Sequence, residues 1–151
     1  MAKNKIATLD KLTYLLSGKN FTFTSGVWDG LHSGHTRYLK KARDFSGILV
    51  VGVHSDLMTK KRKGESRPHF PEEDRAEVIS HLPFVDYIII LKDQDDLYKT
   101  IEELSPSVLV VSTTSEGPEN NAENMKQRFG KLMKVQILEP MSDFHSSGIK
   151  K

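Results

Sequence analysis

Residues 24–35 read TSGVWDGLHSGH, and this stretch decides both the fold and the function that we predict. It follows a short apolar segment, contains three glycines and leads into residues with helical spacing, which indicates a strand, a turn and a helix start. The first N–H groups of a helix have no partner within the helix, and the helix dipole adds positive charge there. We therefore expect this turn to bind a phosphate, with His32 and His35 beside it.

The composition limits the other classes of protein to which the chain could belong. Its 151 residues are 37% hydrophobic and 28% charged, which is typical of a globular protein, and we predict a single domain over residues 1–151. A net charge of +2 does not indicate a nucleic-acid partner. The absence of cysteine excludes disulfides and thiolate metal sites. No apolar run approaches a membrane span, and the N-terminal residues lack a signal-peptide core, so we expect a cytoplasmic protein without membrane contact.

Hydrophobic patterning predicts alternating strands and helices. Apolar runs indicate strands at residues 21–25, 47–53, 86–91, 107–111 and 134–138. Helical spacing indicates helices at residues 8–17, 36–45, 71–81, 95–104 and 119–129. This alternation predicts an α/β fold, a Rossmann-like doubly wound five-stranded parallel sheet with helices on both faces. The basic segment KKRK at 60–63 is predicted to lie in a solvated loop.

The stretch from Gly26 resembles the signature of the cytidylyltransferase-like nucleotidyltransferases, G-S/T-F-D-x-x-H-x-G-H. The positions that match are Gly26, Asp29, His32, Gly34 and His35. Two positions depart from the signature. Val27 removes a hydroxyl that could bind phosphate, and Trp28 stands in place of phenylalanine.

Two further segments extend the resemblance, in the same order as in the family. KGESRP at 63–68, followed by Pro71 and Arg75, is similar to the K-G-x-x-R-P…P-x-x-x-R pattern of the heptose-phosphate adenylyltransferase branch. HSSGIK at 145–150 lies where the family carries I-S-S/T-S/T-x-I, with histidine at one usual serine position. Three motifs in the same order as in the family make the resemblance far more specific than a single motif would.

The resemblance implies transfer of a nucleoside monophosphate from a nucleoside triphosphate to a phosphorylated acceptor, with release of pyrophosphate. Charge then develops on phosphate oxygens, so positioned cationic and N–H donors carry the catalysis. The implied catalytic residues are His32, His35 and Lys63. The implied nucleotide-binding residues are Gly26, Val27, Trp28, Gly34, Arg67, Ser146 and Ser147. Mg²⁺ is expected on the triphosphate and water without a dedicated protein site, and the family implies a homodimer.

Several of these residues have a second interpretation. Trp28 either stacks on the base or fills the core, and the core is slightly favoured. Arg75 either binds substrate or pairs with Glu72 or Asp74. Asp29 is a candidate for orienting the acceptor or a metal-bound water. The serines of the last motif could instead cap a frayed tail, and the basic residues from 60 to 67 could be solvated.

The acceptor and the base stay open at this point. Residues 112–117 read STTSEG where the heptose-phosphate branch carries a K-G-G-D-Y-like segment, and Ser112 and Thr113 are candidates for acceptor binding. The 63–75 pattern favours ATP over CTP and a sugar phosphate as acceptor. The alternatives are a glycerol-phosphate-type cytidylyltransferase, an FMN adenylyltransferase, or a nucleotide-binding regulatory protein without turnover. The three histidines outside the motifs, His54, His69 and His81, are predicted to be structural or on the surface.

Overall fold

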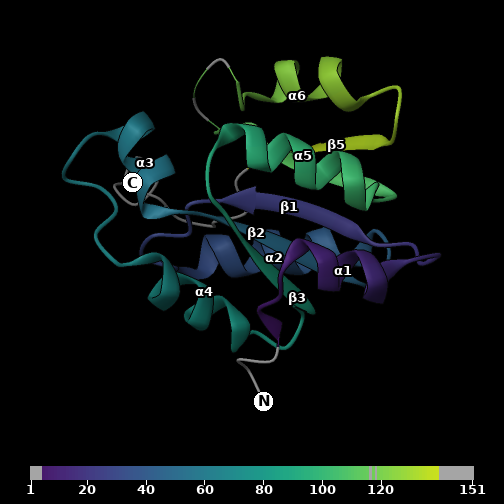
Figure 1. Ribbon diagram of the computed structural model, residues 1–151, viewed down its shortest axis with the longest axis horizontal. Helices are drawn as coiled ribbons and strands as arrows, with labels where there is room; N and C mark the ends of the chain where they lie inside the picture. The colour runs from purple at the N-terminus through teal and green to yellow at the C-terminus, as the bar shows by residue number, and fades with distance from the viewer. Residues whose placement is uncertain (1–4, 116, 118, 140–151) are drawn as a thin grey trace, which may run out of the picture.

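The computed structural model describes residues 5–115, 117 and 119–139, in which five strands form one parallel sheet (Figure 1). The strands are β1 (Thr22–Gly26), β2 (Leu49–His54), β3 (Tyr87–Leu91), β4 (Val108–Ser112) and β5 (Lys134–Leu138). The helices are α1 (Leu9–Leu16), α2 (Ser33–Asp44), α3 (Asp56–Lys63), α4 (Glu72–Ser80), α5 (Gln94–Leu104) and α6 (Ala122–Phe129). The predicted α/β fold with five parallel strands is confirmed.

Helices cover both faces of the sheet, as the sequence predicts (Figure 1). On one face α1, α5 and α6 bury apolar side chains that include Leu12, Ile101 and Phe129. On the other face α2 and α4 bury Leu39 and Ile79. All six residues of β2 are buried, because this strand has neighbours on both sides and helices on both faces. A strand in that position has no solvated face, so its sequence reads as a continuous apolar run.

The strand order β3-β2-β1-β4-β5 reverses at β1. The chain adds β2 and β3 on one side of β1, and then crosses over to place β4 and β5 on the other side. Ligands of open α/β sheets bind beyond the carboxyl ends of the strands at such a reversal. Residues 24–35 leave β1 at this point, and the arrowhead of β1 in Figure 1 points toward the side of the molecule where α3 lies.

Backbone pairing between β1 and β4 is short. It stops at Phe23 and Leu109, whereas β1 pairs with β2 along its whole length. Beyond this point the Thr24 hydroxyl donates to the Val110 carbonyl at 2.9 Å and lies 3.2 Å from the Tyr38 hydroxyl. A buried side chain therefore joins the two strands just before the candidate site begins.

Helix α3 corrects the prediction that residues 60–63 form a solvated loop. Its amino end is well capped, since the Ser55 hydroxyl accepts from the Met58 N–H and Asp56 lies in the first turn. Its last turn is the basic run itself, whose positive charge suits the negative end of the helix dipole. Only Met58 and Thr59 are buried, so the helix lacks the apolar periodicity by which sequence analysis finds helices.

Helix α2 begins at Ser33, three residues before the predicted start at residue 36. Its first turn contains no large apolar residue, and the helical spacing becomes visible only from Tyr38 onward. The two histidines of the motif therefore lie at the helix start itself, not in a preceding loop. In the part of the chain that the structure describes, no helix is long and apolar enough to cross a membrane.

Replacing Thr24 with valine tests the side-chain link between β1 and β4. Thr24→Val keeps the shape but leaves the Val110 carbonyl without its donor, so we expect the free energy of unfolding to fall by about 1–3 kcal/mol. Urea denaturation measures it. Thr13→Val is the matched control, because the Thr13 hydroxyl donates to a helix carbonyl at an exposed position and its loss should cost less than about 0.5 kcal/mol. Equal losses in the two variants would contradict the link.

Candidate active site

His32 and His35 together form the start of α2. His32 is the N-cap residue, and its Nδ1 accepts a hydrogen bond from the Gly34 N–H at 3.0 Å. His35 Nδ1 accepts in return from the His32 N–H at 3.1 Å, and the two ring centroids lie 4.0 Å apart. The pair thus acts as a capping box and satisfies two N–H groups that a helix start otherwise leaves without partners.

These two bonds determine which ring nitrogen carries the proton. A nitrogen that accepts an N–H bears no proton, so each neutral imidazole carries its proton on Nε2. Burial, and then the neighbouring His32, lower the pKa of His35 to about 4. His35 is therefore neutral at pH 7, with Nδ1 held by the backbone and Nε2–H available as a donor.

Trp28 lies in the core beside this helix start. The residue is 8% exposed, and its indole N–H donates to the Gly52 carbonyl at 2.9 Å. It adopts a φ of 57°, a backbone conformation that is uncommon outside glycine. A Cβ at Gly26 would approach the Trp28 ring to 3.0 Å, a tight contact that the ring would have to relieve by shifting a few tenths of an ångström, so the ring favours glycine there. Of the two interpretations of Trp28, the structure therefore supports the one in which the ring fills the core. The rings of Trp28 and His35 make an edge-on contact, with their centroids 5.8 Å apart.

Arg75 is buried and joins four segments around the site. Its residue exposure is 2%, and its N–H groups donate at 2.7–2.8 Å to the carbonyls of Phe70, Val27 and His54 and to the Asp56 carboxylate. The structure therefore supports the salt-bridge interpretation with a different partner, Asp56 of α3, in place of the two acidic residues near Arg75 in sequence. This guanidinium fixes the turn after β1 relative to the end of β2 and the start of α3.

Asp29 holds the loop that follows α3. Its carboxylate accepts from the backbone N–H groups of His69 and Phe70 at 2.7 and 3.1 Å, and Arg67 Nε lies 3.5 Å away. Burial raises the pKa of Asp29, but the two backbone hydrogen bonds and the nearby His69 and Arg67 outweigh it, so the pKa is lowered overall. The negative charge of Asp29 therefore positions residues 67–70 next to the turn after β1. Its role in orienting the acceptor or a metal-bound water stays a prediction.

The other predicted residues come from three places along the chain. Lys63 is the last residue of α3, and Arg67 lies on the loop that Asp29 holds. Ser112 ends β4, where its Oγ accepts from the Thr114 N–H, and the Thr113 N–H donates to the Leu138 carbonyl of β5. These residues follow β2 and β4, the two strands beside β1, so the topology gathers them at one edge of the sheet. Ser146 and Ser147 lie outside the described residues.

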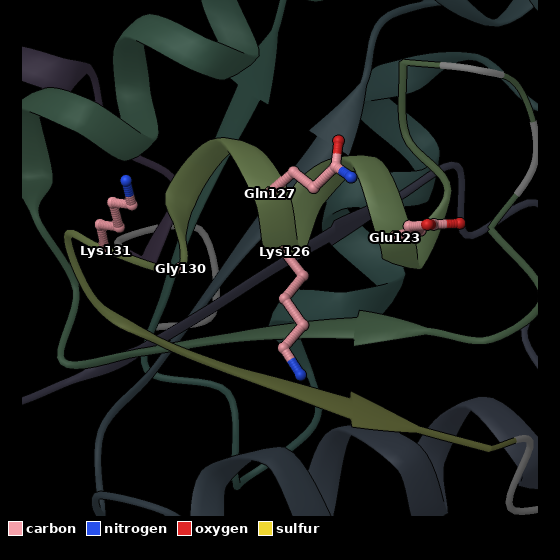
Figure 2. Close-up of a pocket in the computed structure, with 5 residues that line it drawn as sticks. All are labelled: Glu123, Lys126, Gln127, Gly130 and Lys131. Atoms are coloured by element: carbon pink, nitrogen blue, oxygen red, sulfur yellow. The ribbon is translucent and has the colours of Figure 1, made fainter.

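An open hollow of about 460 Å³ lies on α6, away from the motifs described above (Figure 2). It is lined by Glu123, Lys126, Gln127, Gly130 and Lys131. Figure 2 shows the side chains of Lys126 and Lys131 pointing in different directions, so they do not converge on one point. The candidate active site therefore rests on the motif residues at the ends of β1, β2 and β4, and this hollow is not part of it.

Residues 23–151 match the family described as Cytidylyltransferase-like. The chain belongs to the cytidylyltransferase-like family. Among curated relatives it is similar to the bifunctional protein HldE of Campylobacter curvus (strain 525.92), 45% identical over 120 residues, which are 78% of this chain and 25% of that protein. It is 42% identical over 106 residues to HldE of Helicobacter pylori (strain ATCC 700392 / 26695), covering 70% and 23% of the two chains. The chain thus spans about a quarter of the length of these relatives.

Solved structures agree with this family assignment. The lipopolysaccharide core biosynthesis protein of Thermoplasma volcanium GSS1 matches with a TM-score of 0.66 and 30% identity, over 85% of this chain and 100% of that chain. Pantoate-beta-alanine ligase from Francisella tularensis has the same TM-score at 12% identity, over 96% and 75%, and shares the fold alone. The predicted nucleotidyltransferase is confirmed at the level of the family.

The family reaction uses a divalent metal ion, and the described residues are compatible with an ion that the substrate carries. Across residues 5–115, 117 and 119–139, no three His, Asp or Glu side chains converge to form a metal site. The one carboxylate of the cytidylyltransferase-like motif, Asp29, is already bound by two backbone N–H groups. A magnesium ion would therefore be held by triphosphate oxygens and water, which remains a prediction.

Sequence analysis did not find one residue that helps to position this cytidylyltransferase-like site. Asp56, the partner of Arg75, lies at the start of a helix that was not predicted. The signal that could have found it is the dipeptide Ser-Asp directly after a buried strand, which is typical of an N-cap followed by an acidic first turn. His54 is predicted to be structural or on the surface, and its burial at the end of β2 with a 4% exposure agrees with a structural role.

Replacing Arg75 with methionine tests its role as the link around the site. The variant leaves three carbonyls and one carboxylate without their donor, so we expect the free energy of unfolding to fall by about 3–5 kcal/mol in urea denaturation. Arg43→Met is the matched control. Arg43 pairs with Asp86 while its side chain is 38% exposed, and its loss should cost about 1 kcal/mol or less. A smaller loss for Arg75 than for Arg43 would rule out the link.

The lowered pKa of His35 predicts a loss of stability in acid. The unfolded chain binds a proton near pH 6.5 and the folded chain only near pH 4, so the free energy of unfolding should fall as pH drops through this window. His35→Gln should show a smaller fall between pH 7 and pH 5, measured from urea midpoints. Burial lowers the pKa of His54 to about 3 and contributes in the same direction, so part of the fall should persist. An unchanged pH dependence in His35→Gln would contradict the assignment.

Proposed function

We propose that this domain transfers an adenylyl group from ATP to a phosphorylated sugar and releases pyrophosphate. The observation that carries the proposal is the pair of histidines at the start of α2. Their Nδ1 atoms are occupied by the backbone, so their Nε2–H groups are the atoms left to bind phosphate oxygens. They lie where the strand order reverses, the position at which ligands of such sheets bind. The relative from Thermoplasma volcanium is described as a lipopolysaccharide core biosynthesis protein, which favours a sugar phosphate.

The reaction requires hydrogen-bond donors to the phosphate oxygens, and it does not require a nucleophilic side chain. An oxygen of the acceptor phosphate attacks the α-phosphorus of ATP, a new P–O bond forms, and the bond from the α-phosphorus to the bridging oxygen breaks to release pyrophosphate. The Nε2–H groups of His32 and His35 would donate to the α-phosphate oxygens and to the leaving oxygen. Donors that are fixed before the reaction stabilise the developing charge without reorganisation. His35 is suited to this role because its second nitrogen is held in place.

Basic residues at the end of α3 and on the loop after it would complete the phosphate site. Lys63 and Arg67 bring positive charge from the end of α3 and from the loop that Asp29 holds. A magnesium ion bound to the triphosphate would neutralise part of its charge. Ser112 and Thr113 at the end of β4 are proposed to contact the acceptor. We also infer a homodimer and a cytoplasmic location, in line with the family resemblance and the phosphorylated substrates.

Activity measurements distinguish this proposal from its alternatives. We expect pyrophosphate release with ATP and a sugar 1-phosphate, and little with CTP. Release with CTP and glycerol phosphate would indicate a cytidylyltransferase, and release with ATP and flavin mononucleotide would indicate a flavin adenylyltransferase. Nucleotide binding without release across the whole acceptor panel would overturn the enzyme proposal and favour a regulatory protein.

Alanine substitutions test the two histidines directly. His32→Ala and His35→Ala should each lower kcat by roughly 100-fold or more, the scale of losing one fixed transition-state donor. His81→Ala is the control. His81 is the C-cap residue of α4 and its side chain is exposed, so this substitution should leave kcat unchanged. Thermal unfolding checks that each variant remains folded. Full activity in either motif variant would remove the proposed roles.

A further inference from the structure

Trp28 is a bulky residue in a backbone conformation that glycine adopts far more readily. Its φ is 57°, and this left-handed conformation is strained for a residue with a large side chain. Such strain persists where the surrounding structure enforces it, and it is concentrated at functional sites. Both neighbours of Trp28 are fixed, because the Val27 carbonyl accepts from Arg75 and the Asp29 carboxylate accepts from the N–H groups of residues 69 and 70. The turn therefore commits the Trp28 ring to one position.

The indole of Trp28 is anchored to the sheet by a hydrogen bond. Its N–H donates to the Gly52 carbonyl of β2 at 2.9 Å, and the buried ring belongs to the same apolar cluster as Val51 and Val53 of that strand. Phenylalanine, which the family signature carries at this position, has a ring but no N–H group. Filling the core requires only a ring, so the hydrogen bond is a separate property that tryptophan adds here.

The anchored ring supports the first turns of α2. Its centroid lies 5.8 Å from that of His35, with the two ring planes 74° apart, and 6.2 Å from that of Tyr38. Edge-on and tilted arrangements at these distances are the ones that aromatic rings favour. Residues three positions apart lie on the same face of a helix, so Trp28 packs against one face of the α2 start. Because the ring is also bonded to β2, it links this helix start to a strand that is buried along its whole length.

His35 needs such a support because one hydrogen bond does not fix the tilt of a ring. Its Nδ1 accepts from the His32 N–H at 3.1 Å, and the imidazole can still tilt about that bond. The His32 ring lies 4.0 Å away, but His32 is exposed, whereas His35 is half-buried. Trp28 is thus the rigid contact on the buried side of the His35 ring. Hydrogen bonds weaken steeply when they are bent, so a tilt of this ring would misdirect its Nε2–H.

We infer that Trp28 is a positioning residue for His35, which it holds so that the Nε2–H group points at the reacting phosphate. This inference rests on the proposed function, because Trp28 acts through a histidine of that reaction. Misplacing a reacting group by about 1 Å can cost about 100-fold in rate. Without the indole bond the ring of residue 28 and then the imidazole would move, so turnover would fall while the substrates still bind through the other donors. Stacking of Trp28 on the base would instead change the affinity for the nucleotide.

The first test combines Trp28→Phe, which keeps a ring and removes the N–H, with His35→Ala in a double-mutant cycle. We expect Trp28→Phe to lower kcat for pyrophosphate release about tenfold in the wild-type background, with KM for ATP changed less than about twofold. In the His35→Ala background it should lower kcat less than about twofold, because residues that act as a unit are not additive. Phe21→Leu is the matched control. Phe21 is a buried aromatic residue just before β1, at the end of that strand away from the site, so its loss should leave kcat unchanged.

The second test needs no turnover. Nitrogen-15 NMR of the histidine rings at pH 7 distinguishes the two neutral tautomers, and His35→Ala identifies the signals of residue 35. We expect His35 of the wild-type chain to show the Nε2–H tautomer. Trp28→Phe should move both ring signals toward the average of the two tautomers, because a loosened ring no longer keeps its bond to the His32 N–H. Phe21→Leu should leave the signals in place. If Trp28→Phe does not fold, benzothienylalanine at position 28 replaces the indole N–H by sulfur in a ring of the same shape and should give the same shifts.

The outcomes separate this positioning role from the proposed function. Unchanged His35 signals in the folded variant overturn the role. In an active enzyme, unchanged kcat in Trp28→Phe or an equal loss in both backgrounds also overturns it, since Trp28 would then not act through His35. A raised Kd for α,β-methylene-ATP with unchanged His35 signals would indicate stacking on the base and overturns it as well. Displaced His35 signals in a chain that never releases pyrophosphate would support the positioning role while the proposed transfer reaction fails.

Discussion

The guanidinium of Arg75 meets three backbone carbonyls and one carboxylate in a place from which water is excluded. Each carbonyl belongs to a different segment of the chain. Only arginine offers several N–H donors in one rigid plane with a permanent charge. Without it the turn after β1, the end of β2 and the loop before α4 would each lose the donor that joins them. The geometry of the site thus depends on one side chain that lies outside the histidine motif.

A second constraint is that His32 and His35, which we propose bind the substrate, also cap the start of α2. A helix leaves its first N–H groups without partners, and here the side chains of His32 and His35 satisfy two of them. This capping role fixes the orientation of both rings, and the same bonds leave Nε2 as the donor toward a ligand. Structure and proposed chemistry therefore use opposite edges of the same imidazoles. Asp29 adds a comparable link, because its carboxylate holds the loop carrying Arg67 beside the turn.

Much of the fold followed from local patterns. The five strands were visible because buried parallel strands read as apolar runs, and the histidine motif was visible because its glycines and histidines follow the first strand directly. Helix α3 was missed, since its stability comes from a cap and a favourable charge distribution and it buries only two residues. The start of α2 was placed too late for a related reason, because histidine side chains cap it and no apolar residue marks its first turn. Periodicity detects burial, and these two helix segments bury little.

The sequence by itself determined the α/β class, the position of the turn that we propose binds phosphate, and the resemblance to cytidylyltransferase-like enzymes, because these depend on residues close together in the chain. Only the tertiary structure decided that Trp28 fills the core, that Arg75 pairs with Asp56, and that the His54 ring is buried without a hydrogen bond to the described residues. The Trp28 hydrogen bond joins residues 24 positions apart, and the Arg75–Asp56 pair joins residues 19 positions apart. The burial of His54 depends on separate helices and strands that together exclude water. Burial and pairing of that kind arise only when the sheet brings the ends of its strands together.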